Sequence, residues 1–190
     1  EFSPATRMGI AYRSRVHHKV EGDADFSKSP PFIVAATGGW FTDTDVNASV
    51  NLPASASVSV VHQFNPQWEV MADVTWTQWS LFKELRFKFD NGQPDGVTTE
   101  KWKDSYRYSG GVTYKPGNWK FRAGLAYYTT PIRSAAYRTP RIPDANRLWL
   151  AGGLGYRISV RIQMDLGYAH LFVNDTEIRK SATGEDALRG

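Results

Sequence analysis

The chain has 190 residues, with 23 basic and 19 acidic side chains, a mean hydropathy of −0.45 and no cysteine. The lack of cysteine excludes a disulfide scaffold, thiol catalysis and a cysteine metal site, and the small basic excess does not indicate a nucleic-acid partner. No apolar run approaches the roughly 18 residues that a transmembrane helix needs. Yet 14% of the residues are aromatic, including 7 Trp. This combination is typical of a β-barrel with a polar interior and an aromatic-rimmed exterior.

Apolar and polar residues alternate with a period of two in seven segments, which predicts strands with one apolar and one polar face. The clearest example is a hairpin whose arms, of about ten residues each, match the length of a tilted transmembrane strand. Its turn is Phe64-Asn65-Pro66-Gln67, and Trp68 and Trp76 bound the apolar face of its second arm. The predicted strands are 5–20, 54–63, 68–79, 102–115, 119–130, 146–158 and 162–169.

The connections between these strands alternate between long and short. Long connections are predicted at 21–47, 82–101, 131–145 and after 174, and short turns at 64–67, 115–118 and 159–161. Long loops on one rim and tight turns on the other are typical of an outer-membrane barrel. The alternative is a half-buried hairpin in a soluble sandwich, but that fold does not explain why the long loops and the short turns would lie at opposite ends. Trp68 and Trp119 each follow a short turn, so we expect both at one membrane interface.

Two of the long connections contain structured patterns of their own. The apolar centre of the first, 31–36, is expected to fold over an opening. In the second, 81–89 still alternates but with charged residues, which predicts that the strand ending near Trp79 continues beyond the membrane. Connections this long are usually functional or mobile.

The polar faces of the predicted strands carry charges of both signs, which we expect to face the lumen and to pair across neighbouring strands. No nucleophile, zinc-protease or phosphate-loop motif is present, and adjacent His17 and His18 point to opposite faces. The sequence therefore assigns no catalytic residue, no metal ligand and no cofactor. The predicted lumen residues are Glu69, Asp73, Arg107, Arg122, Arg157 and Asp165.

Several ordered segments together resemble one protein family. They are Gly9-Ile10-Ala11-Tyr12-Arg13-Ser14, Leu52-Pro53-Ala54-Ser55, Trp76-Thr77-Gln78-Trp79-Ser80, Phe121-Arg122-Ala123-Gly124-Leu125-Ala126-Tyr127, Arg141-Ile142-Pro143-Asp144-Ala145-Asn146-Arg147-Leu148-Trp149 and Met164-Asp165-Leu166-Gly167-Tyr168-Ala169-His170. In this order they resemble the FadL-type outer-membrane transporters of long-chain fatty acids and other hydrophobic compounds. The similarity covers nearly the whole chain, and the Arg141–Arg147 element is among its more specific parts.

The resemblance implies an antiparallel transmembrane β-barrel of fourteen strands, an N-terminal plug and an extracellular groove that leads to an interior pocket. We expect residues 1–190 to form one partial barrel domain, about seven strands from the C-terminal portion, without the plug and the closing strand. Because unpaired strand edges are not tolerated in lipid, the remaining strands of the barrel are an expected partner.

Two groups of residues are candidates for substrate binding. Arg13, Arg15 and Arg107 lie toward the outer ends of their strands, where a guanidinium could hold a fatty-acid carboxylate. The alternative is that these charges belong to a wall network in contact with the plug. Trp79, Phe82, Phe87 and Trp102 are predicted to form a capture surface for apolar molecules, with an ordinary aromatic belt as the alternative. Asp144 and Arg147 are expected to fix the geometry of a loop, with a ligand role as the alternative.

The resulting hypothesis is passive transport of hydrophobic molecules, most of all long-chain fatty acids, across the outer membrane of a Gram-negative bacterium. The expected partners are a fatty acid or hydrocarbon and the outer-membrane lipid, and nucleic acid is not expected. The main alternative is an outer-membrane barrel with a structural or surface-binding role and no transport. An outer-membrane lipid-modifying enzyme would need a Ser or His constellation that the sequence does not contain.

Overall fold

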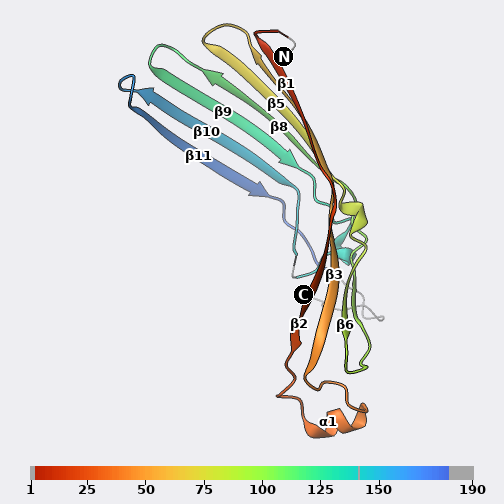
Figure 1. The fold of residues 1–190 in the computed structure, drawn as a ribbon. Coiled ribbons are helices and arrows are strands. Elements are labelled where there is room, and N and C mark those ends of the chain that lie inside the picture. Colours follow the sequence, from red (N-terminus) through yellow and green to blue (C-terminus); the bar gives the residue numbers. More distant parts are fainter. Residues whose placement is uncertain (1–2, 141, 180–190) are drawn as a thin grey trace.

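A computed structural model describes residues 3–140 and 142–179 of the chain, and its main feature is a curved antiparallel sheet of seven strands (Figure 1). The order in the sheet is β1-β4-β5-β8-β9-β10-β11. Among the described residues this sheet does not close, because β1 and β11 each pair on one side only. The strands are β1 (Thr6–Arg13), β4 (Ser55–Gln63), β5 (Trp68–Thr77), β8 (Ser105–Tyr114), β9 (Trp119–Tyr128), β10 (Arg147–Arg157) and β11 (Gln163–Val173).

The register places apolar residues of successive strands in rows on one face of the sheet. One row runs from Val58 to Val74, Tyr108, Tyr127 and Leu148 through successive strand pairs. These side chains remain uncovered, with Val58 47% and Val74 44% exposed. An apolar face of this extent left bare fits the lipid-facing wall of a barrel. The all-β, antiparallel barrel architecture predicted from the alternation is therefore confirmed.

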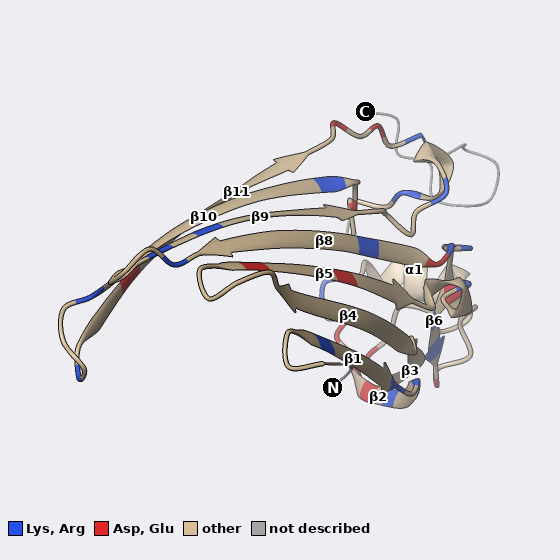
Figure 2. Cartoon of the chain, turned by 90° about the horizontal axis from the view of Figure 1, so that it is seen from above, with Lys and Arg blue, Asp and Glu red and all other residues tan. Residues whose placement is uncertain are grey.

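The opposite face carries the polar rows, and one of them passes through Ser57, Thr75, Arg107, Tyr128 and Arg147. Seen from above, the strands follow one another around an open curved wall, along which charged residues are sparse (Figure 2). The two faces differ because successive side chains of a strand point to opposite sides.

A second antiparallel sheet, in the order β2-β3-β6-β7, extends the molecule beyond the long-loop end of the main sheet (Figure 1). β2 (Val16–Ala24) and β3 (Thr44–Leu52) continue β1 and β4 as one long hairpin. The prediction of an irregular connection at 21–47 was thus wrong at both ends. The backbone ladder from Val16–Leu52 to Ala24–Thr44 keeps these residues extended, and its register places Val20, Ala48 and Val50 on one face and polar side chains on the other.

The apolar segment predicted to cover an opening forms the short helix α1 (Pro31–Ala36). Figure 1 shows this helix at the far tip of the β2–β3 hairpin, away from the seven-stranded sheet, so the covering role was wrong. Among residues 3–140 and 142–179, no helix is long and apolar enough to cross a bilayer.

The strand that was predicted to run past Trp79 is interrupted. A 3-10 turn, η1 (Trp79–Leu81), ends it, and β6 (Glu84–Phe89) then pairs with β3 and with β7 (Gly96–Thr99). The chain therefore leaves the main sheet at η1. This break is what turns Trp79 and Phe82 away from the line of β5.

The short turns all lie at one end of the main sheet, and a chain of aromatic contacts follows that end. Trp68 stacks on Tyr114 at 4.4 Å between ring centroids, and Trp119 lies 4.4 Å from Tyr156. Phe121 connects the two pairs through Tyr114 and Trp119. The prediction that Trp68 and Trp119 share one interface level agrees with this belt.

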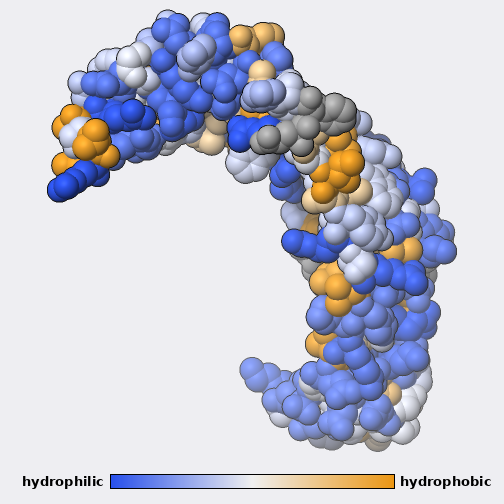
Figure 3. All heavy atoms as spheres, turned by 45° about the horizontal axis from the view of Figure 1, so that its top comes forward, coloured by the Kyte–Doolittle hydropathy of each residue, from blue (hydrophilic) through white to orange (hydrophobic). Residues whose placement is uncertain are grey.

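Few side chains in the described part are fully buried, and most of them lie near the long-loop end of the main sheet. In the view of Figure 3 the molecule is an open arc with separate apolar patches. The buried apolar residues are Ala48, Ala54, Trp102, Ile132 and Ala145, and the buried polar residues include Glu100, Ser105, Thr130, Arg138, Thr139 and Asp144. The best-packed region is thus made by the segments 100–105 and 130–146, which include the 3-10 turn η2 (Ala135–Tyr137).

Candidate functional site

A cavity of about 640 Å³ opens at the long-loop end, between the end of β3, the η1 turn and the loop that precedes β10. Its volume lies within the roughly 300–1,000 Å³ of typical small-molecule sites. We call it the outer pocket, defined by Val50, Asn51, Leu52, Trp79, Phe82, Trp102, Tyr128, Pro131, Ile142, Pro143, Asp144 and Arg147.

Three aromatic rings form one wall of the outer pocket. Trp102 lies 5.1 Å from Trp79 and 4.7 Å from Phe82 between ring centroids. The backbone N–H of Trp102 donates to the carbonyl of Phe82 at 3.2 Å, and its indole Nε1 donates to the Glu100 carboxylate at 2.8 Å. These bonds hold Trp102 in place as the buried part of the wall, because the residue is only 5% exposed.

Among the described residues that line the outer pocket, Arg147 supplies the cationic group, its guanidinium. It forms an ion pair with Asp144 and lies over the ring of Tyr128, with 5.3 Å from Cζ to the ring centroid. The pocket thus combines apolar walls with an oriented cationic donor, beside the neutral polar groups of Asn51 and Tyr128. Such a site can bind an apolar molecule and hold a polar end of it in a fixed direction.

Asp144 is fixed by the loop around it, because the segment before β10 and the segment after β11 meet there. Its Oδ2 accepts a hydrogen bond from Thr130 Oγ1 at 2.9 Å. Arg138 donates from Nε to the Asp144 carbonyl at 3.2 Å and from Nη1 to the Glu177 carbonyl at 2.8 Å. These bonds give the loop residues 130–140 and 142–146 a defined shape, as expected for the Asp144–Arg147 element.

The structure brings together three of the four predicted apolar candidates, Trp79, Phe82 and Trp102. Phe87 lies farther out on β6, opposite Ala48 and Gly96, and does not line the outer pocket. The substrate role of all four residues remains a prediction.

The predicted cationic candidates are not at the outer pocket. Arg13 ends β1 and Arg15 lies in the link to β2, both exposed, and Arg107 is bound to Asp73 in the wall. Sequence reasoning had favoured a role in loop geometry for Arg147 over a ligand role. The signal that could have found it was its parity, since Arg147 and Tyr128 occupy the same face and are direct partners in the ladder.

Charged residues on the polar face pair with one another, between neighbouring strands as predicted for Asp73 and Arg107, and across the intervening β10 for Arg122 and Asp165. Arg107 Nη2 lies 3.2 Å from Asp73 Oδ1, and Arg122 Nη2 lies 2.7 Å from Asp165 Oδ1. Glu69 pairs with Lys115 at 3.3 Å. These pairs join β5 to β8 and β9 to β11 across the wall.

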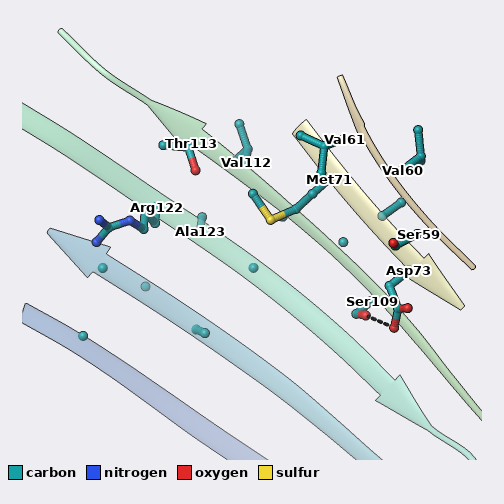
Figure 4. A pocket seen from close by; sticks show the side chains of 18 of the residues that line it. Ser59, Val60, Val61, Met71, Asp73, Ser109, Val112, Thr113, Arg122 and Ala123 are labelled. Atoms are coloured by element: carbon teal, nitrogen blue, oxygen red, sulfur yellow. Dashed lines mark hydrogen bonds between the residues drawn. The ribbon is translucent and has the colours of Figure 1, made fainter. Parts of the chain in front are cut away.

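A second cavity, of about 660 Å³, lies along the wall of the main sheet. Figure 4 shows Met71 and the bonded pair Ser109 and Asp73 on one side of it and Arg122 on the other. Between them the lining consists largely of glycine and alanine on β8, β9 and β10. This wall cavity has no aromatic wall, so the outer pocket is the stronger candidate for binding an apolar ligand.

The whole chain, residues 1–190, matches the sequence model of a family described as "Outer membrane protein transport protein (OMPP1/FadL/TodX)". It is 33% identical over 178 residues to a long-chain fatty acid transport protein of Escherichia coli O6:H1, covering 90% of this chain and 40% of that protein. The chain spans less than half the length of the curated relatives it matches.

Solved structures of similar fold agree with the barrel architecture. A crystal structure of a Pseudomonas aeruginosa FadL homologue matches with a TM-score of 0.81 and 27% identity, covering 94% of this chain and 43% of that one. The Ralstonia pickettii toluene transporter TbuX matches in fold with a TM-score of 0.56 and 21% identity, covering 88% of this chain and 39% of that one.

Proposed function

Since the chain belongs to the family of outer membrane transport proteins described as OMPP1/FadL/TodX, we propose that the protein moves hydrophobic molecules passively across the outer membrane of a Gram-negative bacterium. Long-chain fatty acids are the substrates that we propose first. The observation that carries this proposal is the outer pocket, in which Trp79, Phe82 and Trp102 form an apolar wall and Arg147 is the cation among the described lining residues.

An apolar chain gains free energy when it leaves water for this wall, at roughly 25 cal/mol for each Å² of apolar surface buried. Capture therefore needs no chemical energy source, in keeping with passive transport. The carboxylate of a fatty acid would meet the N–H groups of Arg147, which match it in geometry and charge. Its acyl chain would lie against the aromatic wall.

The three cations predicted from the sequence do not line the outer pocket, but we propose that they act on the substrate near it. Exposed Arg13 and Arg15 would raise the local concentration of anionic substrates near the barrel through long-range attraction. Arg107 lies in the same polar row as Tyr128 and Arg147, beside the outer pocket, where a substrate leaving the pocket would pass it. One relative by fold is a toluene transporter, so aromatic hydrocarbons are the second substrate class that we propose.

The direct test is saturable binding of a C16 fatty acid to the full-length protein in detergent, together with fatty-acid uptake by cells. The substitution Phe82→Ala should weaken binding about tenfold, because a tenfold change corresponds to roughly 1.4 kcal/mol of lost apolar contact. Phe121→Ala is the matched control, since Phe121 lies on the apolar outer face and is 45% exposed. Absence of saturable binding by the unaltered protein would reject the proposed function.

A further inference from the structure

We infer that Asp144 is a specificity-determining residue of the outer pocket, because its carboxylate neutralises Arg147 and so sets the balance between anionic and uncharged hydrophobic ligands. This inference rests on the proposed function. Neither the family description nor the chemistry of an apolar pocket assigns the residue such a role. The Asp144–Arg147 juxtaposition carries it.

Both oxygens of the Asp144 carboxylate already have partners. One pairs with Arg147 Nη2, and the other accepts from Thr130 Oγ1 at 2.9 Å. The residue is only 8% exposed, whereas the side chain of Arg147 is 37% exposed. The acid is therefore the fixed inner partner, and the guanidinium is the part that faces a ligand.

A ligand carboxylate at Arg147 must share the guanidinium with Asp144, and the two negative charges repel each other. Near a protein surface, where the effective dielectric constant is about 20, the repulsion between unit charges several Å apart is strong enough to change an affinity about tenfold. An alcohol of the same chain length meets no such repulsion. Asp144 therefore reduces the preference of the pocket for acids over uncharged analogues.

Other charged groups near the pocket do not replace this effect. The guanidinium of Arg138 is bound to the carbonyls of Asp144 and Glu177 and does not line the outer pocket. The Glu100 carboxylate lies behind the aromatic wall, where it accepts the indole N–H of Trp102. Both groups remain in place when Asp144 is changed, so a change in selectivity reports on Asp144 itself.

The substitution Asp144→Asn tests the inference with little change of shape, because the amide oxygen can still accept from Thr130. We expect the ratio of the affinity for a C16 fatty acid to the affinity for the C16 alcohol to rise about tenfold at pH 8. Asp95→Asn is the matched control, since it removes a carboxylate that pairs with Arg86 outside the pocket. That control should leave the ratio unchanged.

A second pair of variants keeps the test valid if Asp144→Asn fails to fold. Arg147→Gln alone should lower the acid-to-alcohol ratio, because Asp144 is then an unpaired negative charge. The double variant Asp144→Asn with Arg147→Gln should return the ratio toward that of the unaltered protein.

The measurement is competition binding of both ligands to the full-length protein in detergent. The role of Asp144 is overturned if Asp144→Asn leaves the acid-to-alcohol ratio unchanged or lowers it. It is also overturned if the double variant has the same ratio as Arg147→Gln alone. Neither result affects the proposed function. If the unaltered protein binds neither ligand, the proposed function fails and the inference fails with it. If the role of Asp144 were purely structural, Asp144→Asn would weaken the binding of the acid and of the alcohol by the same factor.

Discussion

The indole Nε1 of Trp76 donates a hydrogen bond to Asp104 Oδ2 at 2.8 Å, and the other oxygen of that carboxylate accepts the Ser80 backbone N–H at 3.0 Å. Trp76 lies near the end of β5 on the apolar face, and Asp104 precedes β8. The carboxylate thus ties the η1 turn to the start of the next strand. This bond fixes the place where the chain leaves the membrane-spanning wall and enters the outer pocket.

The first prediction concerns how the contribution of the Asp104 carboxylate to the stability of the fold depends on pH. Partial burial raises the pKa of Asp104, but the hydrogen bonds from Ser80 and Trp76 outweigh it, so the folded-state pKa lies below the ordinary 3.8. A lowered pKa means that the carboxylate stabilises the fold above pH 3.8 and that this contribution is lost as the pH falls through the folded-state pKa.

Tryptophan fluorescence during urea unfolding in detergent, measured from pH 3 to pH 7, checks this expectation. The difference in stability between the unaltered protein and Asp104→Asn should be present at pH 7 and should shrink toward pH 3. A difference that stays constant across this range would show that ionised Asp104 does not support the turn.

The second prediction concerns the Asp73–Arg107 pair in the wall. The Arg107 side chain is 54% exposed, and its Nη2 lies 3.2 Å from Asp73 Oδ1. Exposed pairs of this kind contribute roughly 0.2–1 kcal/mol. A double-mutant cycle of Asp73→Asn and Arg107→Gln, read from urea unfolding, should give a coupling energy in that range, and a value above about 2 kcal/mol would indicate a far less solvated pair than the structure shows.

The third prediction concerns Gly155, which lies beside the Arg122–Asp165 pair. A Cβ on Gly155 would lie 2.7 Å from Asp165 Oδ1, the atom that accepts from Arg122. Gly155→Ala should therefore displace the carboxylate from Arg122 and destabilise the barrel by about 0.2–1 kcal/mol, the usual contribution of an exposed ion pair. Gly124→Ala is the control, since its nearest atom, the Gly110 carbonyl oxygen, would lie at an ordinary 3.5 Å. Equal stability of the two variants would contradict the close contact at Gly155.

The fourth prediction concerns the two faces of the wall. This chain contains no cysteine, so a single cysteine introduced into it is a clean probe of that position. Val74→Cys should stay unreactive toward a water-soluble maleimide in lipid vesicles, because Val74 faces the acyl chains. The neighbouring Thr75→Cys on the polar face should react. The reverse order of reactivity would invert the assigned faces.

The strands of the main sheet could be predicted because each one follows a single rule, the alternation of apolar and polar residues. Val58, Val74 and Leu148 showed the apolar face by parity alone, and the structure aligns them in one row. Strand β3 and the end of β2 beyond Val20 were missed although Val46, Ala48 and Val50 alternate with polar residues, because the Pro-, Gly- and Asp-rich composition of the connection outweighed this short pattern. Backbone pairing and cross-strand bonds, such as His17 Nδ1 with Asn51 Oδ1 at 2.9 Å, hold the two strands together.

Only the aromatic part of the candidate site could be predicted from the sequence. Trp79, Phe82 and Trp102 are close enough in sequence for their clustering at one hairpin to be foreseen. The position of Arg147 against them depends on how loop 130–146 folds, and that fold rests on contacts of Arg138 with Asp144 and with the distant Glu177. Such contacts between irregular segments have no period in the sequence.

The central claim, that the outer pocket receives hydrophobic molecules, is tested most directly by photo-crosslinking. A C16 fatty acid with a diazirine on its chain would be bound to the full-length protein in lipid vesicles, irradiated, and its adducts mapped by mass spectrometry. We predict adducts at Trp79, Phe82 or Trp102 that an excess of unlabelled fatty acid removes. Adducts confined to outer-face residues such as Val58 and Leu125, and unaffected by the competitor, would contradict the claim.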